Sequence, residues 1–169
     1  IRETALAHPK RCAVQSREQK LTYEELEEYS NRLAVWIAKN SQDRKRPVIV
    51  YGHKNPYMVV CFLACAKAGR SYVPQDICIP VSRVDETVLS VEPELTFVVE
   101  GDYQTEIGTE IRKDEIEEIV KQETNETDVL QPLTKDEVWY IIFTSGSTGK
   151  PKGVEITRDC LSHYLEWSV

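Results

Sequence analysis

The sequence lacks any long apolar run, and this excludes one class of protein at the outset. No hydrophobic stretch approaches the roughly eighteen consecutive apolar residues that a membrane-spanning helix needs. We therefore expect no direct insertion into a membrane. With 41% hydrophobic residues among 169, the chain can still build a core, and its length suits one domain or part of a larger one.

Positive charge is outnumbered by negative charge, with 21 Lys and Arg against 28 Asp and Glu. The formal net charge is −7, and the only compact basic cluster, residues 44–46, lies in an expected loop. No basic face is therefore available to replace the counterions of a nucleic acid. We expect no nucleic-acid partner.

The cysteines lack the spacing of a metal site or a redox pair. Five are present, and none belongs to a CxxC pair or has His or Cys partners at the spacing of a zinc site. We predict no metal site, and we predict that all five are small core residues of a reduced, cytoplasmic protein. They are Cys12, Cys61, Cys65, Cys78 and Cys160.

His53 is the histidine that stands closest to an expected core strand, residues 47–51. A histidine there can serve as a ligand or a catalytic base, but no matching acid or nucleophile is evident in the sequence. The favoured interpretation is a structural histidine whose ring is satisfied by hydrogen bonds.

Apolar strands alternate with helical patterns along the chain. Thr22 and Glu25 form a capping-box pattern at one helix start, and Asn55 with Pro56 marks the next. The alternation predicts an α/β fold with a mostly parallel sheet covered by helices. The expected strands are 12–14, 47–51, 72–76, 95–99, 138–143 and 153–156, the last a hairpin-like return. The expected helices include 22–37, 56–69, 80–93, 114–122 and one that begins near Thr157.

The stretch at 144–153, TSGSTGKPKG, carries the strongest functional signal. It follows an apolar run, 138–143, that is typical of a buried strand. Its three glycines, four hydroxyls and two lysines supply backbone freedom, hydrogen-bond donors and positive charge. A core strand that ends in such a loop is typical of a phosphate-binding nest.

Two other interpretations apply to this stretch. A run rich in Gly, Ser and Thr can be a plain connector between structured segments. The sequence Pro151-Lys152-Gly153 at its end is more specific than the composition of a linker requires. A Walker loop requires four residues between its glycines and a Lys-Ser/Thr step into a helix. Gly146 and Gly149 are too close and Lys150 precedes a proline, so the Walker loop is excluded.

These ten residues resemble the phosphate loop of the adenylate-forming enzymes, Thr-Ser-Gly-Ser-Thr-Gly-x-Pro-Lys-Gly, at every fixed position. The resemblance implies that the loop wraps the β- and γ-phosphates of ATP, and that Lys150 falls on the variable position. The implied phosphate-binding residues are Thr144, Ser145, Gly146, Ser147, Thr148, Gly149 and Lys152.

Two further stretches, 21–26 and 67–76, resemble other core motifs of the same superfamily, with Gln75 where an aliphatic residue is usual. Across essentially the whole chain the sequence is also similar to the ligases that activate D-alanine for a carrier protein. The resemblance implies ATP and Mg²⁺ as cofactors. It implies D-alanine and a phosphopantetheinylated carrier protein as partners, in the D-alanylation of teichoic acid.

The resemblance also predicts how the chain is placed in such an enzyme. Residues 1–169 correspond to an N-terminal fragment of the large AMP-binding domain, ending just after the phosphate loop. The Mg²⁺ ligands, the catalytic lysine and the small C-terminal domain are expected downstream, so no catalytic residue is assigned here. Activation of another carboxylic acid and a non-catalytic nucleotide-binding module remain alternatives.

Overall fold

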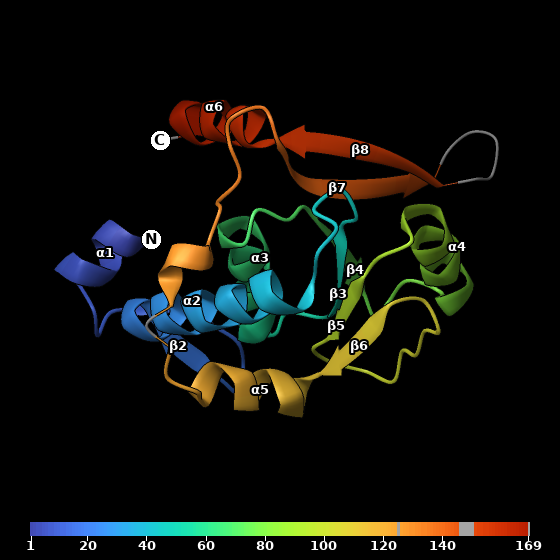
Figure 1. Ribbon diagram of the computed structural model, residues 1–169. Helices are drawn as coiled ribbons and strands as arrows, with labels where there is room; N and C mark the ends of the chain where they lie inside the picture. Colours follow the sequence, from blue (N-terminus) through green and yellow to red (C-terminus); the bar gives the residue numbers. More distant parts are fainter. Residues whose placement is uncertain (125, 146–150, 169) are drawn as a thin grey trace.

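The computed structural model describes residues 1–124, 126–145 and 151–168 (Figure 1). The helices are α1 (Arg2–Ala7), α2 (Tyr23–Asn40), α3 (Pro56–Lys67), α4 (Val81–Val91), α5 (Lys113–Lys121) and α6 (Arg158–Ser168), with a 3₁₀ turn η1 (Thr127–Val129). The strands are β1 (Cys12–Gln15), β2 (Lys20–Thr22), β3 (Val48–Gly52), β4 (Tyr72–Asp76), β5 (Leu95–Val98), β6 (Thr109–Arg112), β7 (Val138–Ser145) and β8 (Pro151–Thr157). None of the helices in this described part combines the length and apolar character of a membrane span.

Within the described residues, six strands form the main sheet in the order β6-β5-β3-β4-β7-β8. Pairing is parallel throughout except between β7 and β8, which form an antiparallel hairpin. The predicted α/β fold with a mostly parallel sheet is therefore confirmed, as is the hairpin-like return. Strands β1 and β2 form a separate antiparallel pair.

Strand β3 lies at the centre of the fold and divides the core into two layers. All five of its residues are buried. Val48 and Val50 belong to a cluster with α2, α3 and α5, whereas Ile49 and Tyr51 pack with α4. The alternation follows from the strand period of two, which sends successive side chains to opposite faces.

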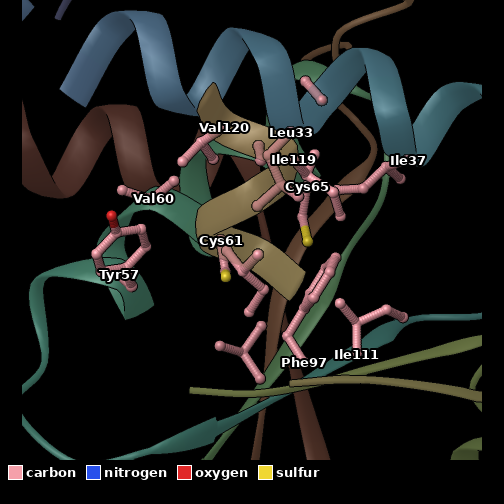
Figure 2. Close-up of a cluster of buried hydrophobic side chains, with 14 of the residues drawn as sticks. Leu33, Ile37, Tyr57, Val60, Cys61, Cys65, Phe97, Ile111, Ile119 and Val120 are labelled. Carbon is pink, nitrogen blue, oxygen red and sulfur yellow. The ribbon is translucent and has the colours of Figure 1, made fainter. Parts of the chain in front are cut away.

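The larger layer is closed by three helices over β3, β5 and β6, as Figure 2 shows. Phe97 of β5 and Ile111 of β6 face the helices, and α5 contributes a buried stripe. The labelled helical residues of this layer are Leu33, Ile37, Tyr57, Val60, Cys61, Cys65, Ile119 and Val120.

The predicted helix starts are confirmed in atomic detail. Glu25 N–H donates to Thr22 Oγ1 at 3.2 Å, and Thr22 N–H donates to Glu25 Oε2 at 2.8 Å, which completes the capping box of α2. Asn55 Oδ1 accepts from Tyr57 N–H at 3.0 Å at the start of α3. These contacts span two or three residues, so the local sequence is sufficient to specify them.

The sequence-based prediction missed β2 and β6 as strands. Strand β6 has one buried side chain, Ile111, flanked by charged residues, so it carries no apolar run to detect. It pairs with β5 alone and forms an edge of the sheet. Charged side chains are common on edge strands, because they oppose pairing with other chains.

The expectation that residues 138–143 form a buried strand is wrong in part. They do lie in a strand, β7, but none of their side chains is fully buried, and Ile142 is 44% exposed. The two core clusters gather mainly over β3, β5 and β6, and β7 lies next to the end of the sheet. Its position in the sheet, which its composition does not reveal, sets its burial.

The prediction that all five cysteines are core residues is also wrong. Cys61 and Cys65 are fully buried on α3, and burial raises the pKa of the Cys65 thiol to about 12. Cys12, Cys78 and Cys160 are exposed free thiols. They lie on β1, in the turn after β4 and in the first turn of α6, outside both clusters.

Two leucines provide a direct test of the core assignment. Leu33 of α2 is fully buried and Leu89 of α4 is 65% exposed. We expect Leu33→Ala to lower the free energy of unfolding by about 3 kcal/mol, since it leaves a cavity. Leu89→Ala should change it by less than about 0.5 kcal/mol. Denaturant unfolding measures both, and equal losses would contradict the assignment.

Candidate functional site

The β7–β8 hairpin places the two ends of the predicted phosphate loop side by side. Thr144 pairs in register with Lys152, and Ser145 pairs with Pro151. Thr144 and Lys152 are both exposed. Three of the predicted site residues are thus brought together at the tip of the hairpin. Gly146, Ser147, Thr148 and Gly149 lie outside the described residues.

Both strands are longer than the sequence predicted. β7 continues beyond Phe143 to Ser145, and β8 begins at Pro151 rather than Gly153. The extra residues are polar apart from Pro151, so no apolar pattern marks them, but they pair with the opposite strand of the antiparallel hairpin. The hairpin therefore fixes the positions from which the loop starts and returns.

A cavity of about 450 Å³ opens next to this hairpin. Its walls come from the ends of three parallel strands, from the start of α3 and from α4. They are formed by Gly52, Lys54, Met58, Pro74, Gln75, Asp76, Ile79, Arg83, Thr87, Ile142 and Phe143.

The cavity lies where the fold leaves an opening. Strands β3, β4 and β7 run in parallel, so their carboxyl ends meet at one edge. After β3 the chain enters α3 on one face of the sheet, and after β4 it enters α4 on the other face. Connections that depart to opposite faces leave a crevice outside the strand ends, where open α/β sheets bind their ligands.

The walls combine apolar surface with charged groups of both signs, because the Asp76 carboxylate lines the cavity together with two cations. Ile142, Phe143 and Met58 give apolar surface, and Lys54 and Arg83 bring positive charge from opposite sides of the sheet. Gln75 and Thr87 are buried polar side chains at the same wall. An apolar cleft with a few polar groups is the usual form of a ligand site.

Sequence analysis did not identify Lys54 or Arg83 as site residues. The available signal was their position, since each follows closely on the carboxyl end of an expected parallel strand. Only the strand order shows that these ends are neighbours.

His53 has a partner that the sequence did not reveal. Its Nδ1 lies 2.7 Å from Oδ2 of Asp76, at the end of the neighbouring strand. The Cys78 N–H donates to Asp76 Oδ1 at 2.8 Å, and this bond, followed by the contact with His53, lowers the pKa of Asp76. The interpretation of His53 as a hydrogen-bonded histidine agrees with this geometry.

A mostly parallel α/β sheet with a crevice at its strand ends is an arrangement in which nucleotides commonly bind. Residues 1–168 match the family model described as "AMP-binding enzyme". The chain belongs to this family.

Several curated relatives of the chain bear the same name. It is 37% identical over 171 aligned residues to a D-alanine–D-alanyl carrier protein ligase of Bacillus thuringiensis (strain Al Hakam), and 38% identical to the ligase of Bacillus mycoides (strain KBAB4). In both cases the alignment covers 100% of this chain and 34% of the relative. The chain thus spans about a third of the length of these relatives.

Solved structures show the same fold. O-succinylbenzoate coenzyme A synthetase (MenE) from Bacillus subtilis, in complex with AMP, matches 98% of this chain with a TM-score of 0.78 at 22% identity, and the match covers 43% of that protein. The N-terminal subdomain of Klebsiella oxytoca NpsA matches 93% of this chain with a TM-score of 0.77 at 25% identity, and the match covers 39% of that protein. Both likenesses confirm the predicted fold class.

Gly153 offers a test of how the hairpin forms the cavity wall. A Cβ there would lie 3.0 Å from Ile141 Cγ2 and 3.2 Å from Phe143 Cζ, and Phe143 lines the cavity. We expect Gly153→Val to displace the Phe143 ring and to destabilise the protein by about 1–3 kcal/mol. Val154→Thr, at a neighbouring side chain that is 47% exposed, is the control and should change little. Unfolding curves that coincide for the two variants would contradict this packing.

Proposed function

We propose that this chain is the phosphate-binding part of an ATP-dependent ligase that activates D-alanine as D-alanyl-adenylate. The ligase then transfers the D-alanyl group to the phosphopantetheine thiol of a carrier protein, for the D-alanylation of teichoic acid. The observation that carries the proposal is the 37% identity, across the whole chain, to D-alanine–D-alanyl carrier protein ligases. The hairpin supports it, because it holds Thr144 and Lys152 together beside a crevice at the carboxyl edge.

The reaction has two steps. A carboxylate oxygen of D-alanine attacks the α-phosphorus of ATP, the bond to the β-phosphate oxygen breaks, and pyrophosphate leaves. The phosphopantetheine thiolate then attacks the acyl carbon, and AMP leaves with the bonding electrons. Adenylation is required because a free carboxylate is a poor electrophile.

In this proposal the chain contributes binding and charge stabilisation. Lys152 pairs with Thr144 in the hairpin, and its ammonium group is proposed to oppose the negative charge that gathers on the departing pyrophosphate. The hydroxyls of Thr144, Ser145, Ser147 and Thr148 and the N–H groups of Gly146 and Gly149 are the proposed donors to the β- and γ-phosphates. Mg²⁺ would add charge neutralisation, with ligands from outside this chain.

The share of the related ligases that this chain covers is consistent with its being one part of a larger enzyme. We propose that it forms the N-terminal part of the large AMP-binding domain, in line with its covering 34% of the related ligases. The catalytic lysine and the small C-terminal domain then belong to the rest of the protein. Five free cysteines suit the reducing cytoplasm, where ATP is available.

The decisive experiment is amino-acid-dependent exchange of pyrophosphate into ATP by the complete protein. We expect D-alanine to support exchange at least about tenfold faster than L-alanine, which is a difference of about 1.4 kcal/mol in transition-state binding. Exchange with a different acid would support an adenylate-forming enzyme but contradict D-alanine as its substrate. ATP binding without exchange for any acid would favour a non-catalytic nucleotide-binding module.

Lys152 tests the role of the hairpin. We expect Lys152→Ala to lower kcat/KM for ATP about 100-fold, as loss of one charge-stabilising donor commonly does. Lys150→Ala is the matched control, two residues away at the variable position of the motif, and it should stay within about threefold of the unmodified protein. If Lys152→Ala leaves kcat/KM unchanged, the stretch is a connector rather than a phosphate loop.

A further inference from the structure

Three side chains with different ligand atoms converge beside the crevice, on the surface of the molecule. His53, Asp76 and Cys78 each offer one nitrogen, oxygen or sulfur atom, and these atoms lie within 4.8 Å of one another. Among the residues that the structure describes, this is the group of three His, Cys, Asp or Glu side chains close enough to share an ion.

The convergence follows from the sheet and from one tight turn. Gly52 pairs in register with Asp76, so His53 leaves β3 beside the point where Asp76 ends β4. The chain then turns, with Ile79 N–H donating to the Asp76 carbonyl at 2.9 Å. This turn returns the exposed Cys78 to the same side as the Asp76 carboxylate.

We propose that His53, Asp76 and Cys78 form a Zn²⁺-binding site. Imidazole nitrogen, carboxylate oxygen and thiolate sulfur are the ligands that zinc takes in proteins. Three protein ligands leave the fourth tetrahedral position to water or another small ligand, which is the pattern of an open zinc site.

Small side-chain movements are enough to form the site. Zinc–ligand bonds of about 2.0–2.3 Å place ligand atoms roughly 3.3–3.8 Å apart in a tetrahedron. The His53 Nδ1 to Asp76 Oδ2 distance of 2.7 Å must therefore widen by about 0.6–1 Å. The two side chains are 32% and 44% exposed, so they have room to rotate.

One of the three proposed ligands, Asp76, is already oriented by a hydrogen bond. Cys78 N–H donates to Oδ1 of Asp76, which orients the carboxylate so that its other oxygen faces His53. Such outer contacts on a ligand increase metal affinity. Lys54 lies nearby, and its positive charge repels a bound cation. Because Lys54 is exposed, this repulsion is weakened by the surrounding solvent and salt.

The site is accessible from two sides. Asp76 lines the cavity of about 450 Å³, and His53 lines a larger groove of about 1420 Å³ between the β1–β2 turn and α3. A metal ion can therefore enter from solvent without local unfolding. The proposed ligase function makes no use of these three side chains as ligands, so this inference is independent of it.

Cobalt titration tests the site. We take the complete protein without an affinity tag, remove metals with a chelator, and add Co²⁺ while recording the absorption spectrum. One equivalent should produce a thiolate-to-cobalt charge-transfer band and tetrahedral d–d bands, and Zn²⁺ should abolish both. Cys78→Ser should remove the charge-transfer band, and His53→Gln and Asp76→Asn should each weaken binding at least about tenfold.

Helix α6 supplies a matched control. It carries the same three residue types in Asp159, Cys160 and His163, with His163 Nε2 3.9 Å from Asp159 Oδ2 and an exposed Cys160. Cys160→Ser and His163→Gln should leave the titration unchanged. The proposal is overturned if the unmodified protein shows no thiolate band. It is equally overturned if the band survives Cys78→Ser, or if Cys160→Ser removes it.

A second measurement needs no variant and covers the case in which a substitution prevents folding. Zn²⁺ should slow alkylation of Cys78 at least about tenfold, as mapped by mass spectrometry. Cys12, which is also exposed, should react at the same rate with and without the metal. Equal rates for Cys78 in both conditions overturn the site. Neither readout depends on ligase activity, so a failure of the proposed function cannot be mistaken for a failure of the metal site.

Discussion

Parallel pairing of β3 with β4 and of β4 with β7 is the constraint on which the rest of the structure depends. Because the three strands run in the same direction, their carboxyl ends meet at one edge of the sheet. The crevice, the β7–β8 hairpin and the contact between His53 and Asp76 all lie at that edge. Residues far apart in the sequence thereby share one site.

The burial of β3 maintains this arrangement. Its side chains alternate between the layer of α2, α3 and α5 and the layer of α4. If the pairing of β3 slipped by one residue, each of its side chains would face the opposite layer. At the opposite edge, Arg70 Nη2 donates to Glu94 Oε2 at 2.7 Å, which links the segments that enter β4 and β5. The Arg70 side chain is almost fully buried, and the half-buried Glu94 carboxylate supplies the opposite charge that it requires.

The two proposed sites at this edge differ in chemistry. The hairpin offers hydroxyls, backbone donors and the Lys152 cation, which suit phosphate oxygens. The turn after β4 offers imidazole, carboxylate and thiol, which suit a borderline metal ion. Both are built on strand ends that a rigid sheet holds in place, which is where α/β folds place ligand sites.

The sequence by itself determined what depends on near neighbours. It was sufficient to predict the α/β alternation and the capping box of Thr22 and Glu25, since each depends on residues close together in the sequence. The motif at 144–153, on which the proposed phosphate site rests, is likewise a local feature of the sequence. Only the tertiary structure decided the features that depend on residues far apart in the sequence. The edge strand β6, the half-exposed β7, the three exposed cysteines and the acid beside His53 follow from the order of strands and the coverage by helices. Position within the sheet sets burial and partners, and local composition does not encode it.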